Sequence, residues 1–168
     1  KIHLKDRVAH PNVKEDILKI VVVERHKATG NIGIGFIQGF GLKKGAIGSS
    51  VAHDSHNLVV VGTNDQDILK AVMAIKEMGG GLVVISDGRV LASLPLPIAG
   101  LMSEASVFQV NLQLEALHHA AKTLGCKLPD PFMTLSFMSL PVIPELKITD
   151  KGLVDVNQFK FVPLFGED

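Results

Sequence analysis

Short apolar runs rich in β-branched residues recur through the first half of the chain and predict a β-sheet. The runs are bounded by charged residues or glycine, as is typical of buried strands. Asn31–Gly39 differs, because it alternates glycine with isoleucine and phenylalanine and so predicts a strand that another backbone approaches closely. The other strands of this part are expected at Ile17–Arg25, Ala46–Val51 and Leu58–Gly62.

A hairpin is the clearest local signal. Leu82–Ser86 and Arg89–Leu94 flank Asp87-Gly88, and Asp-Gly suits the primed turns that match the twist of paired strands. Further along, a turn is expected at Thr149–Gly152 and an alternating strand at Phe159–Val162.

Two segments carry apolar residues at helical spacing. Asn64 can cap a helix that runs through Met78 and ends at Gly79-Gly80-Gly81. Ser103 is expected to cap the longest helix, which ends at Gly125. The supporting apolar positions are Ile68, Val72, Ile75 and Met78 in the first helix, and Val107, Val110, Leu114, Leu117, Ala121 and Leu124 in the second.

The chain of 168 residues fits one domain. Residues 1–14 are polar, with a turn at Pro11 and Asn12, and are interpreted as a linker or N-terminal extension. Residues 15–168 are expected to form a single domain with a mixed β-sheet and two main helices. The predicted class is therefore α+β or α/β.

The amino-acid composition indicates that part of the surface is apolar. Hydrophobic residues make up 46% of the chain and the mean hydropathy is +0.31, yet no run approaches the roughly 18 apolar residues of a membrane span. We therefore expect no membrane association, and an apolar surface that packs against another domain or subunit. Basic and acidic residues number 17 each and are interspersed, which argues against nucleic-acid binding.

The single cysteine, Cys126, excludes an intramolecular disulfide and suits a reducing cytoplasm. The first residues contain no apolar signal core, and the chain begins without methionine. A cytoplasmic chain cut from something longer would have these features, and so would a trimmed one.

The polar run Ser49–Asn57 is the main candidate site, because it joins two apolar strands. His53 and His56 can donate, accept or shuttle a proton, and Asp54 can fix a histidine tautomer. Ser49, Ser50 and Asn57 complete the candidate set, the last two with directional hydrogen bonds. A ligand-contacting loop and a tight turn with satisfied backbone groups are equally compatible with this pattern.

A metal site in the same run would need the loop to curl, because positions 53 and 56 face opposite sides of a strand. No HxH, HExxH or CxxC pattern accompanies it, so we expect no metal bound by this chain.

Secondary candidates are Glu24, Arg25 and His26, which could equally form a surface ion pair, and Asn64. His118-His119 is expected on a solvated helix face. The glycine-rich stretches lack the Lys-Ser/Thr of a phosphate loop, and Cys126 lacks a dedicated base.

Several longer motifs resemble, in order, the C-terminal domain of the microbial adenine deaminases, members of the amidohydrolase superfamily. The likeness runs from about residue 17 to Phe165. Its segments are Val23–His26, Gly45–Ile47, Ser49–Asn57, Val61–Asp65, Gly79–Gly81, Leu94–Ser103, Asp130–Phe137 and Leu140–Leu146.

The resemblance implies one part of a hydrolase of purine metabolism that converts adenine and water to hypoxanthine and ammonia. In that family a binuclear manganese or iron centre lies on a (β/α)₈ barrel that precedes this domain. The barrel is absent here, so the chain alone is expected to be inactive. The implied partners are that barrel, adenine and other copies in a homo-oligomer.

Within this family the loop 49–57 is expected to face the mouth of the barrel, where it could contact the purine or shield it from water. Two alternatives stay open. The domain could be purely structural and build an oligomer interface, or it could be a free-standing purine-binding module without catalysis.

Overall fold

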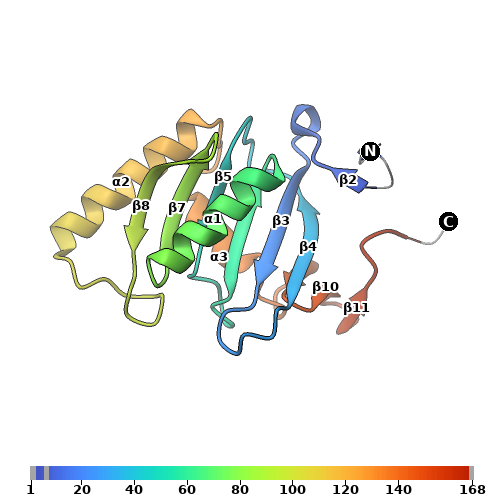
Figure 1. Ribbon diagram of the computed structural model, residues 1–168. Coiled ribbons are helices and arrows are strands. Elements are labelled where there is room, and N and C mark those ends of the chain that lie inside the picture. Colours follow the sequence, from blue (N-terminus) through green and yellow to red (C-terminus); the bar gives the residue numbers. More distant parts are fainter. Residues whose placement is uncertain (1–2, 6–7, 167–168) are drawn as a thin grey trace.

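The computed structural model describes residues 3–5 and 8–166, and in this part of the chain six strands form the main sheet (Figure 1). Their order is β4-β3-β6-β5-β7-β8, and each strand pairs with its neighbours in an antiparallel direction. The strands are β3 (Leu18–Val23), β4 (Ile32–Ile37), β5 (Ala46–Ser49), β6 (Leu58–Gly62), β7 (Gly81–Ser86) and β8 (Arg89–Pro95).

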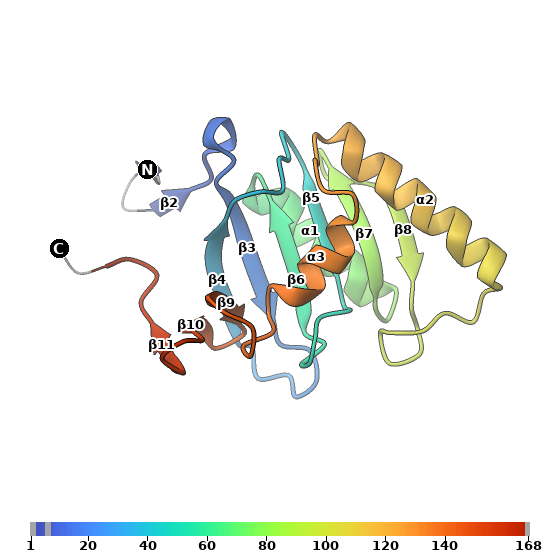
Figure 2. The same ribbon diagram turned by 180° about the vertical axis from the view of Figure 1, so that it is seen from behind.

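Helix α1 (Asp65–Glu77) covers one face of this sheet, over β5, β6 and β7. Helices α2 (Val107–Thr123) and α3 (Pro131–Phe137) cover the opposite face (Figure 2). The small sheet of β9 (Leu146–Thr149), β10 (Gly152–Asp155) and β11 (Lys160–Val162) packs on that same face against β4.

Alternation along the strands divides the core into two apolar layers. On β3, Val21 faces α1, whereas Ile20 and Val22 face α2 and α3. No helix in the described residues is long and apolar enough to cross a bilayer.

The α+β class and the two main helices are confirmed. The sheet is antiparallel throughout, however, and not mixed in direction. Strands β6 and β7, which α1 connects, run in parallel directions, as strands joined by a helical crossover commonly do. Here β5 lies between β6 and β7 and pairs with both, so the two parallel strands never touch.

Helix α3 and the strands β9 and β10 were not predicted. Pro131 occupies the first turn of α3, where its missing N–H group costs nothing. Asp130 caps this helix by accepting a hydrogen bond from the Met133 backbone N–H at 3.0 Å. The turn expected at Thr149–Gly152 joins β9 to β10.

The glycine-rich strand confirms the expected close approach of another backbone. A Cβ atom added to Gly33 would lie 1.8 Å from the carbonyl oxygen of Thr149, at the end of β9. The small sheet can therefore rest directly on β4 only because this position has no side chain.

The segment 1–14, interpreted as a linker, contains a short hairpin of β1 (His3–Lys5) and β2 (Val8–His10). Residues 1–2 and 6–7 lie outside the described part. The Asp16 carboxylate ties the following turn to the end of β4, because it accepts hydrogen bonds from the backbone N–H groups of Gly39 and Gly41 at 2.9 and 2.7 Å.

The cap expected at Ser103 was wrong, because α2 begins after Ser106. The Ser106 hydroxyl accepts a hydrogen bond from the Gln109 backbone N–H, and the Gln109 side chain accepts one from the Ser106 N–H, so the two residues form a capping box. Ser103 only accepts a local bond from the Ala105 N–H.

We expect Ser106→Ala to lower the free energy of unfolding by about 1 kcal/mol, because an N–H group at the helix start loses its acceptor. Ser103→Ala is the matched control and should change it by less than about 0.5 kcal/mol. Urea denaturation followed by circular dichroism measures both. Equal effects of the two changes would contradict the assignment of the cap.

Candidate functional site

All candidate residues except Asn64 lie at one end of the main sheet, where three loops meet (Figure 1). The loop 24–31 leaves β3 and the loop 50–57 enters β6, and their flanking residues Val23 and Leu58 are register partners. The loop 96–103 joins them through Gly100, whose carbonyl accepts a hydrogen bond from the Ser50 hydroxyl at 2.6 Å.

Three of the predicted residues are buried and hold the loop 50–57 in place. Ser50 also accepts a hydrogen bond from the Gly81 backbone N–H at 2.8 Å, and Ser49 bonds the backbone of Val51. The Asn57 amide donates to the Asp150 carboxylate at 3.2 Å. These hydrogen bonds lie within the protein and support the loop, whereas the buried Oδ1 atom of Asn57 has no hydrogen-bond partner among the described residues.

Asp150 is a residue that the sequence analysis missed. Its second carboxylate oxygen accepts a hydrogen bond from the Asn31 amide at 3.2 Å, so it bridges the loops 24–31 and 50–57. Its turn was predicted, but no sequence signal placed that turn beside Asn57, more than 90 residues earlier.

His53, Asp54 and His56 are the predicted residues that the loop presents to solvent. Asp54 is exposed and both histidines are half-buried. The His53 ring lies 5.0 Å from the Phe137 ring and 6.0 Å from the His56 ring, between ring centres. The His53 backbone N–H donates to the Ser136 carbonyl at 2.9 Å, which attaches the loop to α3.

The tautomer of His56 follows from its hydrogen bond. The Nδ1 atom accepts from the Ala52 backbone N–H at 3.3 Å, so the ring proton of the neutral form lies on Nε2. Burial lowers the pKa of His56, and the neighbouring His53 and Arg25 lower it further. Near neutral pH, His56 therefore presents an uncharged ring with one Nε2–H donor.

Arg25 holds two of the loops together. Its Nε atom donates to the His56 carbonyl at 2.5 Å and its Nη2 atom donates to the Ala99 carbonyl at 2.7 Å. Gly100 leaves room for the guanidinium, since a Cβ atom there would lie 2.7 Å from Nη2. Burial lowers the pKa of Arg25 below its usual value.

His26 and Glu24 organise the first loop. His26 Nε2 lies 2.8 Å from the Ser55 carbonyl, and because a carbonyl only accepts, this nitrogen carries a proton. The Glu24 carboxylate accepts from the backbone N–H groups of Lys27 at 2.7 Å and Thr29 at 3.0 Å, and from that of His26. Glu24 and Arg25 therefore bind backbone groups of the loops.

These hydrogen bonds, the one from Thr29 first, lower the pKa of Glu24 to about 2. Because the folded state favours the ionised carboxylate, its contribution to the loop is fully present above pH 4.5 and is lost as pH falls towards 2. An NMR titration should give a Glu24 midpoint near 2, and Glu24→Gln should remove this transition from the Thr29 amide. A midpoint between 4 and 5 would contradict the hydrogen bonding described here.

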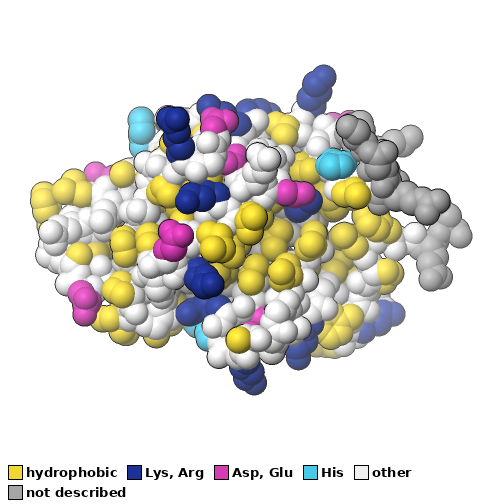
Figure 3. All heavy atoms as spheres, in the orientation of Figure 1, with side chains coloured by type: hydrophobic (Ala, Val, Ile, Leu, Met, Phe, Trp, Pro, Cys, Tyr) yellow, Lys and Arg dark blue, Asp and Glu magenta, His cyan; other side chains and the backbone are white. Residues whose placement is uncertain are grey.

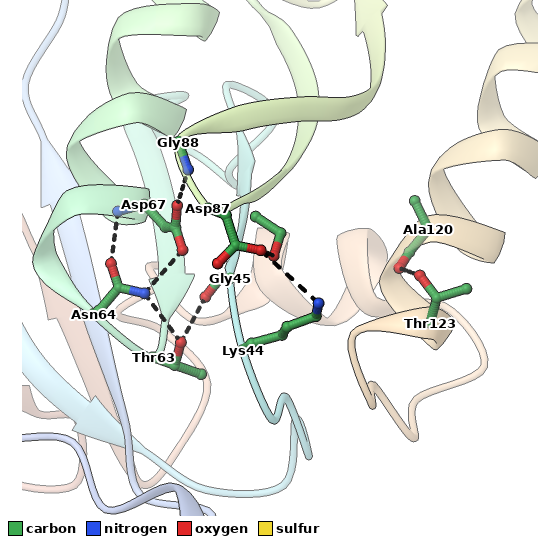
Figure 4. Close-up of polar contacts among 10 residues, drawn as sticks. Lys44, Gly45, Thr63, Asn64, Asp67, Asp87, Gly88, Ala120 and Thr123 are labelled. Carbon is green, nitrogen blue, oxygen red and sulfur yellow. Dashed lines mark hydrogen bonds and ion pairs between the residues drawn. The ribbon is translucent and has the colours of Figure 1, made fainter.

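Asn64 lies at the opposite end of the sheet and belongs to a structural cluster (Figure 4). It accepts a hydrogen bond from the Asp67 N–H at 2.8 Å and so caps α1 as expected, while Asp67 accepts from the Gly88 N–H in the hairpin turn at 2.8 Å. This secondary candidate is not brought to the other site residues.

The remaining histidines and the cysteine lie away from the three loops. His119 is exposed as expected, whereas His118 is half-buried, stacks on Phe132 and lies 3.5 Å from an Asp130 oxygen. Cys126 is buried, and burial raises its pKa. Among the described residues, no three His, Cys, Asp or Glu side chains are placed to hold a metal ion.

A cavity of about 530 Å³ lies beside this end of the sheet, between α1 and the loop 24–31. Its walls include Val23 and Arg25 on one side, and Val72, Ile75 and Lys76 of α1 on the other. No sequence pattern predicts this cavity, because its walls come from elements that are distant along the chain.

Comparison with known proteins identifies close relatives. A family model described as adenine deaminase C-terminal domain matches residues 1–160. The adenine deaminase of Desulfatibacillum aliphaticivorans is 65% identical over 150 residues, which are 89% of this chain and 26% of the relative. That of Dehalococcoides mccartyi is 57% identical over 163 residues, 97% of this chain and 28% of the relative. Adenine deaminase 2 of Carboxydothermus hydrogenoformans is 60% identical over 154 residues, 91% of this chain and 27% of the relative. The chain thus spans about a quarter of the length of these relatives.

Proposed function

Because the chain belongs to the adenine deaminase C-terminal domain family, we propose that it completes the active site of a longer hydrolase. This enzyme converts adenine and water to hypoxanthine and ammonia. The reaction takes place on a preceding barrel domain, and the loop 50–57 covers the mouth of that barrel.

The placement of His53 and His56 is the observation that carries this proposal. Both rings are half-buried on a loop whose backbone is fixed by Arg25, Ser50 and Asn57. A rigid loop can position a donor without losing conformational entropy on binding. The neutral Nε2–H group of His56 suits a purine ring nitrogen, which accepts a hydrogen bond.

A metal centre of manganese or iron would be held by the barrel, since the described residues of this chain bring no set of three ligands together. On its own the chain is therefore expected to be inactive. Its single buried thiol supports a cytoplasmic location.

The test is to change His53 and His56 separately to alanine in a full-length enzyme with this domain. We expect kcat/KM for adenine to fall at least tenfold for one or both, since a group that contacts or shields the substrate is lost. His119→Ala, on the exposed side of α2, is the matched control and should leave kcat/KM unchanged. Unaltered kinetics in both loop variants would remove the loop from the active site.

A structural role in a homo-oligomer is the second candidate. The N-terminal half of α2 extends beyond β8 in both views (Figures 1 and 2) and exposes Val107, Phe108 and Leu112. Such a group of apolar side chains is typical of a contact between subunits. Unaltered kinetics in the loop variants, combined with dissociation of the enzyme by Phe108→Ser, would favour this role.

A further inference from the structure

We infer that a second apolar surface, on β4 and the outer side of α1, is where the preceding domain of the same polypeptide docks. This β4–α1 face consists of Ile32, Ile34, Phe36, Leu69 and Met73. The inference rests on the proposed function in one respect, namely that the chain is part of a longer enzyme.

Strand β4 shows why this face needs a partner. Its glycines face β9 and β10, so the alternating apolar side chains point to the other face of the sheet. These are Ile32, Ile34 and Phe36, whose register partners on β3 are Val23, Val21 and Lys19. That is the side of α1, but α1 packs over β5, β6 and β7 and leaves β4 uncovered. Ile32 and Ile34 are consequently 56% and 48% exposed. Edge strands that face water commonly carry charged or polar residues at such positions.

Helix α1 continues the same surface. Leu69 is 63% exposed, and Met73 follows it one turn later on the outer side of the helix. Figure 3 shows hydrophobic side chains gathered over β3 and β4 beside α1, with few charged groups among them. An α-helix that faces only water would carry polar residues here.

The N-terminal segment identifies the occupant. The relatives are about four times as long as their match to this chain, and the matching family describes a C-terminal domain. The preceding polypeptide therefore enters through β1 and β2, beside the β4 edge of the sheet (Figures 1 and 2). Asp16 fixes this entry to the end of β4. A domain tethered at this edge has a high effective concentration at the β4–α1 face, which a second copy lacks.

The face also leads to the candidate site. Ile32 is the first residue of β4, where the loop 24–31 returns to the sheet, and its register partner Val23 lines the cavity beside α1. A domain docked on β4 and α1 would thus reach the loop 24–31, which carries Arg25 and His26.

Methionine oxidation in the wild-type full-length enzyme tests this inference without any substitution. Met73 is 40% exposed in this chain and Met133, on α3, is 54% exposed, so without a docked domain both should react with dilute hydrogen peroxide at similar rates. We expect Met73 to be oxidised at least tenfold more slowly than Met133 in the native enzyme, and equally fast after denaturation in urea. Similar rates in the native enzyme would overturn the inference.

Thiol labelling distinguishes the preceding domain from a second copy. Ile34→Cys should react with a maleimide at least tenfold more slowly than Phe161→Cys, which replaces an exposed side chain of β11. The protection should persist in enzyme diluted until it is monomeric. Protection that disappears on dissociation would assign the face to another subunit and overturn the inference. If the protection persists while the His53 and His56 variants keep full activity, the proposed role of the loop 50–57 in the active site is wrong. The inference that the preceding domain docks on the β4–α1 face then still holds.

Discussion

Gly33→Ala is expected to lower the free energy of unfolding by about 3 kcal/mol or more. The new Cβ atom would lie 1.8 Å from the carbonyl oxygen of Thr149 and 2.9 Å from its carbonyl carbon. Both are backbone atoms, so no side chain can rotate away. The small sheet of β9–β11 would have to separate from β4.

Gly35→Ala is the matched control, because Gly35 lies on the same strand and the same face. Its Cβ atom would meet Ile20 Cγ2 at 3.4 Å, an ordinary contact with a side chain. We expect a change within about 1 kcal/mol for this variant. The chain has no tryptophan or tyrosine, so urea unfolding is best followed by circular dichroism. Equal stability of the two variants would show that β9 does not rest on Gly33.

Arg25→Ala is expected to lower the free energy of unfolding by about 2 kcal/mol, since hydrogen bonds to charged groups contribute about 1.5–3 kcal/mol. The change leaves the carbonyl groups of His56 and Ala99 without their donor and opens a space beside Gly100. Lysine cannot replace the guanidinium, because one ammonium group lacks the fork that reaches both carbonyls.

Hydrogen exchange distinguishes this loss of attachment from general unfolding. In Arg25→Ala the amides of the loops 50–57 and 96–103 should exchange at least tenfold faster than in the wild type. The amides of α1 should keep their wild-type protection at denaturant concentrations too low to unfold the protein. Lys27→Ala removes a neighbouring cation with an exposed side chain and serves as the control. If the loop amides of Arg25→Ala keep their wild-type protection, Arg25 does not hold the loops together.

Local chemistry in the sequence was enough for several elements of the fold. Asn64 caps the start of α1 and Gly79-Gly80-Gly81 follow its end, as expected. Asp87-Gly88 forms the hairpin turn between β7 and β8. These signals work because a cap or a turn is decided by residues within a few positions of one another. Ser103 and Ser106 could not be distinguished by type, since both are serines ahead of the same apolar pattern.

Strand order and direction were beyond the reach of such signals. The insertion of β5 between β6 and β7, and the contact of Thr149 with Gly33, depend on how distant segments share the core. The glycine alternation of β4 showed that some backbone comes close, but only the folded chain identifies it as β9.

For the candidate site, too, the sequence predicted one part and the tertiary structure decided another. The sequence located the polar run 49–57 between two strands, and its residue types indicated where titratable groups would lie. The tertiary structure decided which of them remain available, because Ser49, Ser50 and Asn57 are buried, the last two beside distant segments, whereas His53, Asp54 and His56 lie at the surface. Residue type alone determines what chemistry a side chain can perform. Whether it faces a ligand or the protein itself depends on contacts with residues such as Arg25 and Asp150, which only folding brings together.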